Sequence, residues 1–231
     1  MTRISIIIPV LNEVEVIEQL LIHLTKNSKN PNQLEIIVID GGSTDGSQKS
    51  IQKFKNVTLL HSEKGRAKQM NLGAKHAQNS ILYFLHADSF PPKYYDQSII
   101  SEVEQGNLAG CFRMQFDSNH WWLRLASWLT QFSWRACRGG DQSQFITKQL
   151  FEVIGGYDEN YIIYEDNMLI NELYSRKQFT VINKKIETSA RLYKKHGVWK
   201  LQYHFWSIYI KKWLGASAEE LLAYYKKYIA S

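Results

Sequence analysis

Four short apolar runs alternate with helical stretches over the first ninety residues, and this alternation constrains the fold more than any other feature of the sequence. The runs cover residues 3–10, 34–40, 57–61 and 81–85. Continuous apolar runs rich in β-branched residues are typical of strands buried on both faces, as in parallel sheets. Helices are expected over 13–24, from Ser43 or Thr44 onward, and over 67–78. We therefore predict an α/β fold in which helices cover both faces of a mostly parallel sheet.

The second half of the chain is less regular. A strand is expected over 108–116, an aromatic-rich helix over 120–134, a helix over 166–176, and one or two helices rich in Trp, Tyr and Lys over 198–229. No internal repeat, low-complexity tract or linker interrupts the sequence. We therefore expect one domain over 1–231 that ends in a helical extension over 196–231.

The charge balance is basic, with a net charge of +6, and the excess of Lys and Arg is concentrated after residue 184. A solvated surface explains such an excess, and nucleic acid, anionic lipid or a phosphorylated substrate are the alternative partners. Cys111 and Cys137 form no C-x-x-C pair, which favours a reducing compartment. No export signal or membrane-spanning run is recognised, so we expect a cytoplasmic protein, with the inner face of the membrane as the alternative location.

Polar residues follow three of the predicted strands at the point where each strand ends. They are Asn12 and Glu13, Asp40, and the segment 86–88. Ligands of parallel α/β sheets bind at the carboxyl ends of the strands, so these residues predict a shared site. Neither a G-x-G-x-x-G dinucleotide fingerprint nor a G-x-x-x-x-G-K-[ST] phosphate loop is present, which disfavours both of those nucleotide sites.

Several motifs occur in a fixed order along the chain. Residues 6–13 read I-I-I-P-V-L-N-E, 37–47 read I-V-I-D-G-G-S-T-D-G-S, 65–73 read G-R-A-K-Q-M-N-L-G, and 85–88 read L-H-A-D. This set resembles the nucleotide-binding half of glycosyltransferase family 2, which has the Rossmann-type GT-A fold, and the match continues through 155–158 and Glu165-Asp166. Residues 140–142 and 188–191 further resemble a bacterial subgroup associated with radical-SAM and selenium-domain gene neighbourhoods, some of them linked to arsenosugar biosynthesis. The resemblance implies a nucleotide-binding half over 1–90 and an acceptor and catalytic half over 91–195.

The resemblance implies roles for residues of the first half in donor binding. The nucleoside would contact Pro9, Asn12, Glu13 and Asp40, and the diphosphate would lie near Gly65, Arg66, Lys68 and Asn71, where a helix begins. Each role has a structural alternative. Asp40 can cap a turn, Glu13 suits the start of a helix, and the residues from Gly65 onward can form a solvated basic turn.

The segment His86-Ala87-Asp88 takes the place of the D-x-D metal motif of the family. A hard cation such as Mn²⁺ or Mg²⁺ needs oxygen ligands, so Asp88 is the expected metal ligand beside the donor diphosphate. His86 replaces the first acid of the motif, and its imidazole suits Mn²⁺ better than Mg²⁺. The structural alternative for Asp88 is a turn cap ahead of Pro91 and Pro92.

By the same resemblance, Asp166 is the catalytic base that takes the proton of the acceptor hydroxyl, and Glu165 supports it. The alternative is a pair of acids at a helix N-terminus. Gly140, Asp141 and Gln142 fall where the family contacts donor or acceptor sugars, although a turn explains them equally well.

These roles combine into one predicted activity. We expect inverting transfer of a sugar from a nucleoside-diphosphate sugar, with UDP foremost by its frequency in the family, to an unknown acceptor hydroxyl. The alternatives are a nucleotidyltransferase and a non-catalytic sugar-nucleotide-binding protein at a membrane surface. No nucleic-acid partner is expected. The aromatic helices are expected to pack into the core or to form an acceptor pocket or a homodimer face, with peripheral membrane contact as the alternative.

Overall fold

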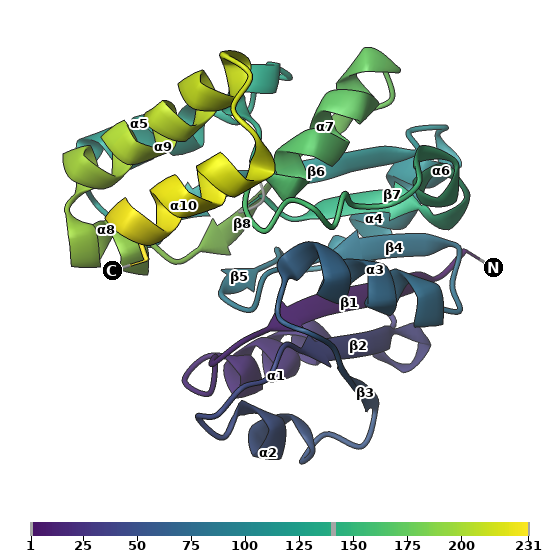
Figure 1. Cartoon of the computed structure of the whole chain (residues 1–231). Coiled ribbons are helices and arrows are strands. Elements are labelled where there is room, and N and C mark those ends of the chain that lie inside the picture. The colour runs from purple at the N-terminus through teal and green to yellow at the C-terminus, as the bar shows by residue number, and fades with distance from the viewer. Residues whose placement is uncertain (1, 140–141, 231) are drawn as a thin grey trace.

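The computed structural model describes residues 2–139 and 142–230, and in this part of the chain eight strands form one sheet (Figure 1). The order across the sheet is β3-β2-β1-β4-β7-β6-β8-β5. The strands are β1 (Ile4–Val10), β2 (Glu35–Asp40), β3 (Val57–His61), β4 (Ile81–Phe84), β5 (Ser89–Phe90), β6 (Ala109–Phe116), β7 (Gln144–Thr147) and β8 (Thr180–Thr188). The predicted α/β class is therefore confirmed.

Helices cover both faces of this sheet, as predicted. They are α1 (Ile17–Asn27), α2 (Ser47–Ile51), α3 (Arg66–His76), α4 (Tyr95–Glu104), α5 (Trp121–Leu129), α6 (Lys148–Ile154), α7 (Glu165–Ser175), α8 (Arg191–His196), α9 (Val198–Trp213) and α10 (Ala218–Tyr228). Alternate residues of β1 point to opposite faces. Ile6 and Ile8 pack with α1, α2 and α4, whereas Ile7 packs with α3, α6 and α7. The all-apolar strand is thus explained by burial on both sides.

The pairing of the strands brings their carboxyl ends to one edge. Strands β1, β2, β3 and β4 pair in parallel, with Val10 opposite Asp40 and Asp40 opposite His61. Strand β7 then runs antiparallel between β4 and β6, and β6 pairs with β8 in parallel. The sheet is therefore parallel in its first half and mixed in its second, because β7 and the two-residue strand β5 run opposite to the other strands.

Several elements differ from the sequence predictions. Helix α1 begins at Ile17 rather than at Glu13, because the Glu13 carbonyl accepts the N–H groups of Val16 and Ile17 in a preceding turn. Neither Ser43 nor Thr44 caps α2, since this helix follows Gly46 in the left-handed conformation. Helix α5 ends at Leu129, well short of residue 134.

The helices α5, α8, α9 and α10 gather at one end of the molecule, beyond β6 and β8 (Figure 1). Two small apolar clusters hold this layer together. One joins Met114 and Phe116 of β6 to Leu123 of α5, and the other joins Leu201 of α9 to Leu221 of α10. No helix among residues 2–139 and 142–230 has both the length and the apolar character needed to cross a bilayer.

Gly73 marks the closest approach of helix α3 to the sheet. A Cβ atom at this position would lie 2.5 Å from Ile7 Cγ2 and 2.7 Å from Ile39 Cδ1. We expect Gly73→Ala to lower the free energy of unfolding by about 1–2 kcal/mol, because overpacking outweighs the better helix propensity of alanine. Urea unfolding with Lys75→Ala, at an exposed position of the same helix, is the control; a Gly73→Ala protein as stable as the parent would contradict the close packing.

Candidate functional site

Asp40 lies fully buried at the carboxyl end of β2, where it organises the following loop. Its carboxylate accepts hydrogen bonds from the backbone N–H groups of Gly42 at 3.0 Å and Ser43 at 3.1 Å, and from Gln48 Nε2 at 2.7 Å. Burial by itself raises the pKa of Asp40, but the hydrogen bonds from Ser43, Gln48 and Gly42 outweigh it and lower the pKa. The carboxylate therefore stays ionised at the edge of the sheet.

The loop after β1 is fastened to this loop by side chains. Asn12 Oδ1 accepts the Thr44 N–H, and the N–H groups of Asn12 and Glu13 donate to the hydroxyls of Ser43 and Ser47, each at 2.9 Å. Asn12 adopts a positive φ of 57°, which Asn tolerates better than most residues. Pro9 is buried in β1 just below this loop. The predicted nucleoside residues thus lie together at the ends of β1 and β2, with Pro9 and Asp40 buried beneath the two loops.

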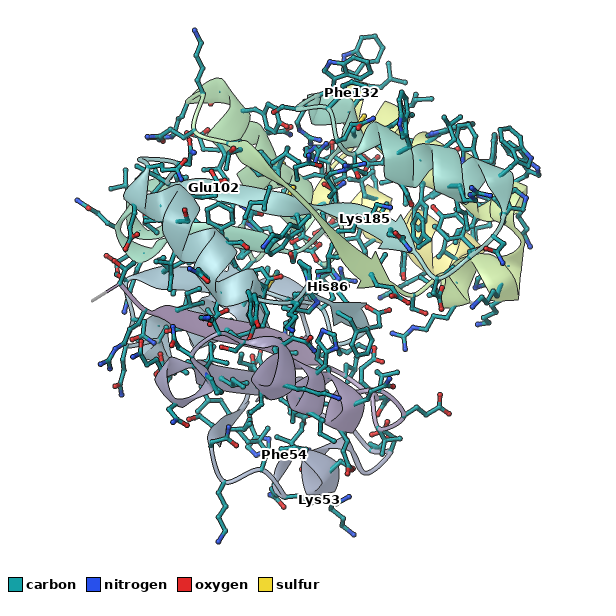
Figure 2. The ribbon with its side chains drawn as sticks, turned by 180° about the vertical axis from the view of Figure 1, so that it is seen from behind. Lys53, Phe54, His86, Glu102, Phe132 and Lys185 are labelled. Atoms are coloured by element: carbon teal, nitrogen blue, oxygen red, sulfur yellow. The ribbon has the colours of Figure 1, made fainter. Side chains whose placement is uncertain are left out.

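A charged cluster joins the two halves of the chain. Arg66 begins α3 directly after Gly65, whose φ is 149°, and its Nη1 lies 3.4 Å from Glu165 Oε1 and 3.9 Å from Asp166 Oδ2 at the start of α7. His86 Nε2, from the segment after β4, lies 3.7 Å from Asp166 Oδ2. Figure 2 shows His86 in the middle of the molecule, between the first strands and the helices of the second half.

The electrostatic environment of this cluster is unusual. Burial raises the pKa of Glu165, and the positive charge of Arg66 offsets this only in part. Within the described residues Glu165 Oε1 is buried without a hydrogen bond. Burial, and then the charge of Arg66, lower the pKa of His86 to about 3, so its imidazole is neutral at pH 7. Perturbed groups of this kind are typical of functional sites.

A second charged cluster lies beside the first. Arg191, at the start of α8, binds both carboxylate oxygens of Glu13, at 2.5 and 2.6 Å, and its Nε lies 3.4 Å from Asp88 Oδ2. The hydrogen bond to Glu13 raises the pKa of Arg191. Only Ala87 separates Asp88 from His86, so the two clusters adjoin. Asp88 and Asp166 therefore lie at the same edge of the sheet.

Two predicted diphosphate residues have other partners in the structure. Lys68 Nζ pairs with Glu63 on the surface. The side chain of Asn71 bonds the backbone N–H and carbonyl of Tyr157, each at 2.9 Å, and Glu159 as well. Asn71 thereby ties α3 to the segment 157–159, which precedes α7 in the sequence.

The predicted sugar-contact loop is only partly described. Gly140 and Asp141 lie outside the described residues. Gln142 is buried, and its amide accepts from Arg138 Nη1 at 2.6 Å and donates to the Cys137 carbonyl. Its Oε1 also lies 3.2 Å from Cys111 Sγ. The side chain of Gln142 therefore holds Cys137 and Arg138 in place, and its contact with a sugar stays a prediction.

The predicted metal site can be compared with the groups that the structure places there. Among the described residues no three His, Cys, Asp or Glu side chains are grouped to hold a metal ion. Asp88 supplies one carboxylate, and Glu13 supplies a second one nearby, since Arg191 forms ion pairs with both. Mg²⁺ and similar ions often bind one or two carboxylates together with substrate phosphates. The residues therefore fit a cation that arrives with a diphosphate, and not a fully protein-built cage.

Two residues at the site had no role predicted from the sequence. Gln69 is buried and donates from Nε2 to the carbonyls of Val10 at 2.9 Å and Ile39 at 2.7 Å, which holds the ends of β1 and β2 together. Arg191 joins Glu13 to Asp88 across 178 positions of sequence. Both residues occur within motifs noted above, but a motif on one segment does not show which distant segment packs against it.

The sheet order and the polar edge define a GT-A-type α/β protein. The model of the family described as "Glycosyl transferase family 2" matches residues 5–158, and the chain belongs to this family. The match includes Asp40 at the end of β2 and Asp88 in the segment after β4, and it stops before Asp166.

Curated relatives share part of their length with this chain. Glycosyltransferase AglE of Haloferax volcanii is 29% identical over 106 residues, which are 43% of this chain and 35% of AglE. Undecaprenyl-phosphate 4-deoxy-4-formamido-L-arabinose transferase of Proteus mirabilis is 27% identical over 133 residues, or 54% of this chain and 41% of the relative. The matches thus span about two fifths or less of the length of these two relatives.

Solved structures share the fold. S. aureus TarS in complex with UDP superposes with a TM-score of 0.66 at 16% identity, over 82% of this chain and 61% of TarS. The mannosyltransferase PcManGT from Pyrobaculum calidifontis, in complex with GDP-Man and Mn²⁺, gives a TM-score of 0.65 at 19% identity, over 99% of this chain and 64% of that chain.

Proposed function

We propose that this chain is an inverting glycosyltransferase that moves a sugar from a nucleoside-diphosphate sugar, UDP foremost, to an acceptor hydroxyl with the help of Mn²⁺ or Mg²⁺. One observation carries the proposal: Arg66, His86 and Asp166 meet within 4 Å at the carboxyl edge of the sheet, beside Asp88. The UDP complex of TarS and the GDP-Man complex of PcManGT support a nucleotide-sugar donor for a chain of this fold and family.

The donor is assigned to the first half of the chain. The nucleoside lies against Pro9, Asn12, Glu13 and Asp40, and the diphosphate faces Arg66 at the start of α3, where a helix N-terminus favours an anion. Asp88 holds the divalent ion, which supplies positive charge to the leaving diphosphate when it is bound. In this proposal residues 1–90 bind nucleotide, 91–195 carry the acceptor and the base, and 196–231 form the helical extension.

The reaction is a single displacement. The acceptor oxygen forms its bond to the anomeric carbon as the bond to the diphosphate oxygen breaks, and the leaving nucleoside diphosphate takes the electron pair. Asp166 accepts the proton of the acceptor hydroxyl. Arg66 and Glu165 orient Asp166, because Arg66 lies within 4 Å of both acids. Attack opposite the leaving group inverts the anomeric centre.

The resemblance at 188–191 also supports placing the chain in the radical-SAM-associated bacterial subgroup. Arg191 is the residue of that motif with a defined place in the site, through its contacts with Glu13 and Asp88. On this proposal Arg191 closes the donor site from the second half of the chain.

A thermal-shift panel of nucleoside-diphosphate sugars, with and without Mn²⁺, tests the proposed function. We expect one donor to raise the unfolding temperature only when Mn²⁺ is present, since a ligand at about 100 times its Kd adds about 2.7 kcal/mol of stability. The same donor should then release nucleoside diphosphate on incubation. Release of pyrophosphate from a nucleoside triphosphate would instead identify a nucleotidyltransferase, and binding without any turnover would identify a non-catalytic binding protein.

A further inference from the structure

Helix α9 carries two apolar faces, and only one of them is covered. Leu201 and Ile208 are buried against α10. On the opposite side the helix exposes five large apolar residues at i, i+4, i+7, i+11 and i+14, a spacing that places them on one stripe. They are Trp199, Tyr203, Trp206, Ile210 and Trp213.

Helix α5 adds a second exposed stripe next to the first. Its members are Trp121, Leu125 and Trp128, spaced i, i+4 and i+7. The ring of Trp199 lies 5.7 Å from that of Trp121 and 5.4 Å from that of Trp122, so the two stripes join. We name these eight residues the aromatic face; their exposure ranges from 38% for Leu125 to 84% for Trp213.

This exposure corrects the expectation that the aromatic helices pack into the core. In α5 only Leu123 is buried, and in α9 only Leu201 and Ile208. Contiguous apolar patches of this kind are rare on proteins that work alone in water, and they mark surfaces for a partner or a membrane. Phe132 follows α5 in the sequence, and its ring stacks on that of Trp134. Figure 2 shows Phe132 at the end of the molecule opposite Lys53 and Phe54.

The charge around the aromatic face selects its partner. The segments 118–139 and 189–216, which contain α5, α8 and α9, hold no Asp or Glu. Their exposed basic residues outside the proposed donor site are Arg124, Lys194, Lys195, Lys200 and Lys211. A second copy placed on this face would bring two basic surfaces together, whereas anionic lipid headgroups would neutralise them.

A groove beside the aromatic face offers the same chemistry. It has a volume of about 810 Å³ and is lined by Leu125 and Trp128 of the aromatic face, together with three basic side chains and one acidic side chain, namely Arg113, Arg124, Lys185 and Asp117. The groove thus combines apolar and mainly basic side chains, which suit the acyl chains and the phosphates of a bilayer surface.

We propose that the aromatic face docks this protein onto an anionic lipid bilayer, with α5 and α9 lying in the plane of the surface. Trp and Tyr rings enter the headgroup region, where an apolar ring with a polar N–H or O–H is most stable. The flanking Lys and Arg side chains bind the lipid phosphates. The docking involves none of the groups assigned to sugar transfer, so it can hold or fail independently of the proposed function.

Co-sedimentation with phosphatidylcholine vesicles, with and without phosphatidylglycerol, tests this proposal on the whole chain. We expect binding to the anionic vesicles with a blue shift of tryptophan fluorescence, weaker binding to neutral vesicles, and partial release by salt. Trp206→Ser/Trp213→Ser should weaken binding by about tenfold or more, and Arg124→Glu/Lys200→Glu should remove the preference for anionic lipid.

The matched control is Ile22→Ser/Val153→Ser, which removes two exposed apolar side chains far from the aromatic face in sequence and should bind as the parent does. Circular dichroism verifies that each variant is folded, and the single change Trp213→Ser replaces the double variant if that one does not fold. Equal binding by parent and Trp variants would overturn the proposal. So would a stable homodimer in sedimentation velocity that the Trp variants dissociate, because the face would then belong to a second copy.

Discussion

Replacing Asp166 by Asn is expected to reduce the rate of sugar transfer by about 10²–10⁴-fold while donor binding stays close to that of the parent protein. The substitution keeps the size of the side chain but removes its capacity to take a proton. Asp166 lies 3.9 Å from Arg66 and 3.7 Å from His86, so its carboxylate sits where both halves of the chain meet. The rate is measured as nucleoside diphosphate released at saturating donor, and binding as the thermal shift with the same donor.

Glu172→Gln provides the matched control for Asp166→Asn. Glu172 belongs to the same helix, is half exposed and pairs with Arg176 on the surface, so its loss should leave the rate unchanged. A loss of donor binding in Asp166→Asn as large as the loss of rate would show that Asp166 serves the donor and not the acceptor. An unchanged rate would remove Asp166 from the role of base.

The first half of the fold could be predicted because its local and long-range signals agree. Strands β1, β2 and β4 are buried on both faces along nearly their whole length, so their residues are mostly apolar and can be recognised in the sequence alone. Strand β3 lies at the edge of the sheet and is only partly buried, with Thr58 and His61 exposed. Parallel pairing then places Asp40 and the segment after β4 at one edge without further assumptions. For this reason the position of Asp40 and Asp88 followed from strand order.

The second half gave weaker signals. Strand β8 is exposed along one side, with Lys184 and Lys185 in its middle, and β7 is only four residues long. Neither shows the period or length that identifies a strand. The position of Arg191 depends on how α8 packs against the loop after β1, which is a tertiary contact with no local signature. The sequence therefore contained the motif of Arg191 but not its partners.

The aromatic helices show a different limit. The spacing of Trp199, Tyr203 and Trp206 predicts a helix face, but periodicity is the same for a face that packs on protein and for one that is left bare. Only the arrangement of α9 on α10 decides between them, because Leu201 and Ile208 already fill the contact with α10. Burial had to be read from the structure, since the composition favours either outcome.

Asp88→Asn is expected to weaken the part of donor binding that depends on Mn²⁺, so that the Mn²⁺ concentration needed to support it rises by about 100-fold or more. The carboxylate is the expected ligand of the cation, and a hard divalent ion binds a neutral amide much more weakly. Removing Mn²⁺ from the parent protein with a chelator should reproduce the effect of the substitution. Titration of Mn²⁺ at fixed donor, followed by the thermal shift, measures both.

The contact between Asp88 and Arg191 makes this prediction specific. In Asp88→Asn the guanidinium of Arg191 loses its ion pair with Asp88 but keeps its hydrogen bonds to Glu13. The contact between the two halves of the chain is therefore only partly lost. Asp117→Asn is the control, because it also removes a carboxylate that pairs with a basic side chain. Asp117 follows β6 and lies 3.2 Å from Lys194 Nζ. It should keep full dependence on Mn²⁺, since Asn retains an oxygen that can accept the Ala190 N–H and only the charge paired with Lys194 is lost. If Asp88→Asn and Asp117→Asn shift the Mn²⁺ titration equally, Asp88 acts only as a partner of Arg191, and the cation must be held by other groups.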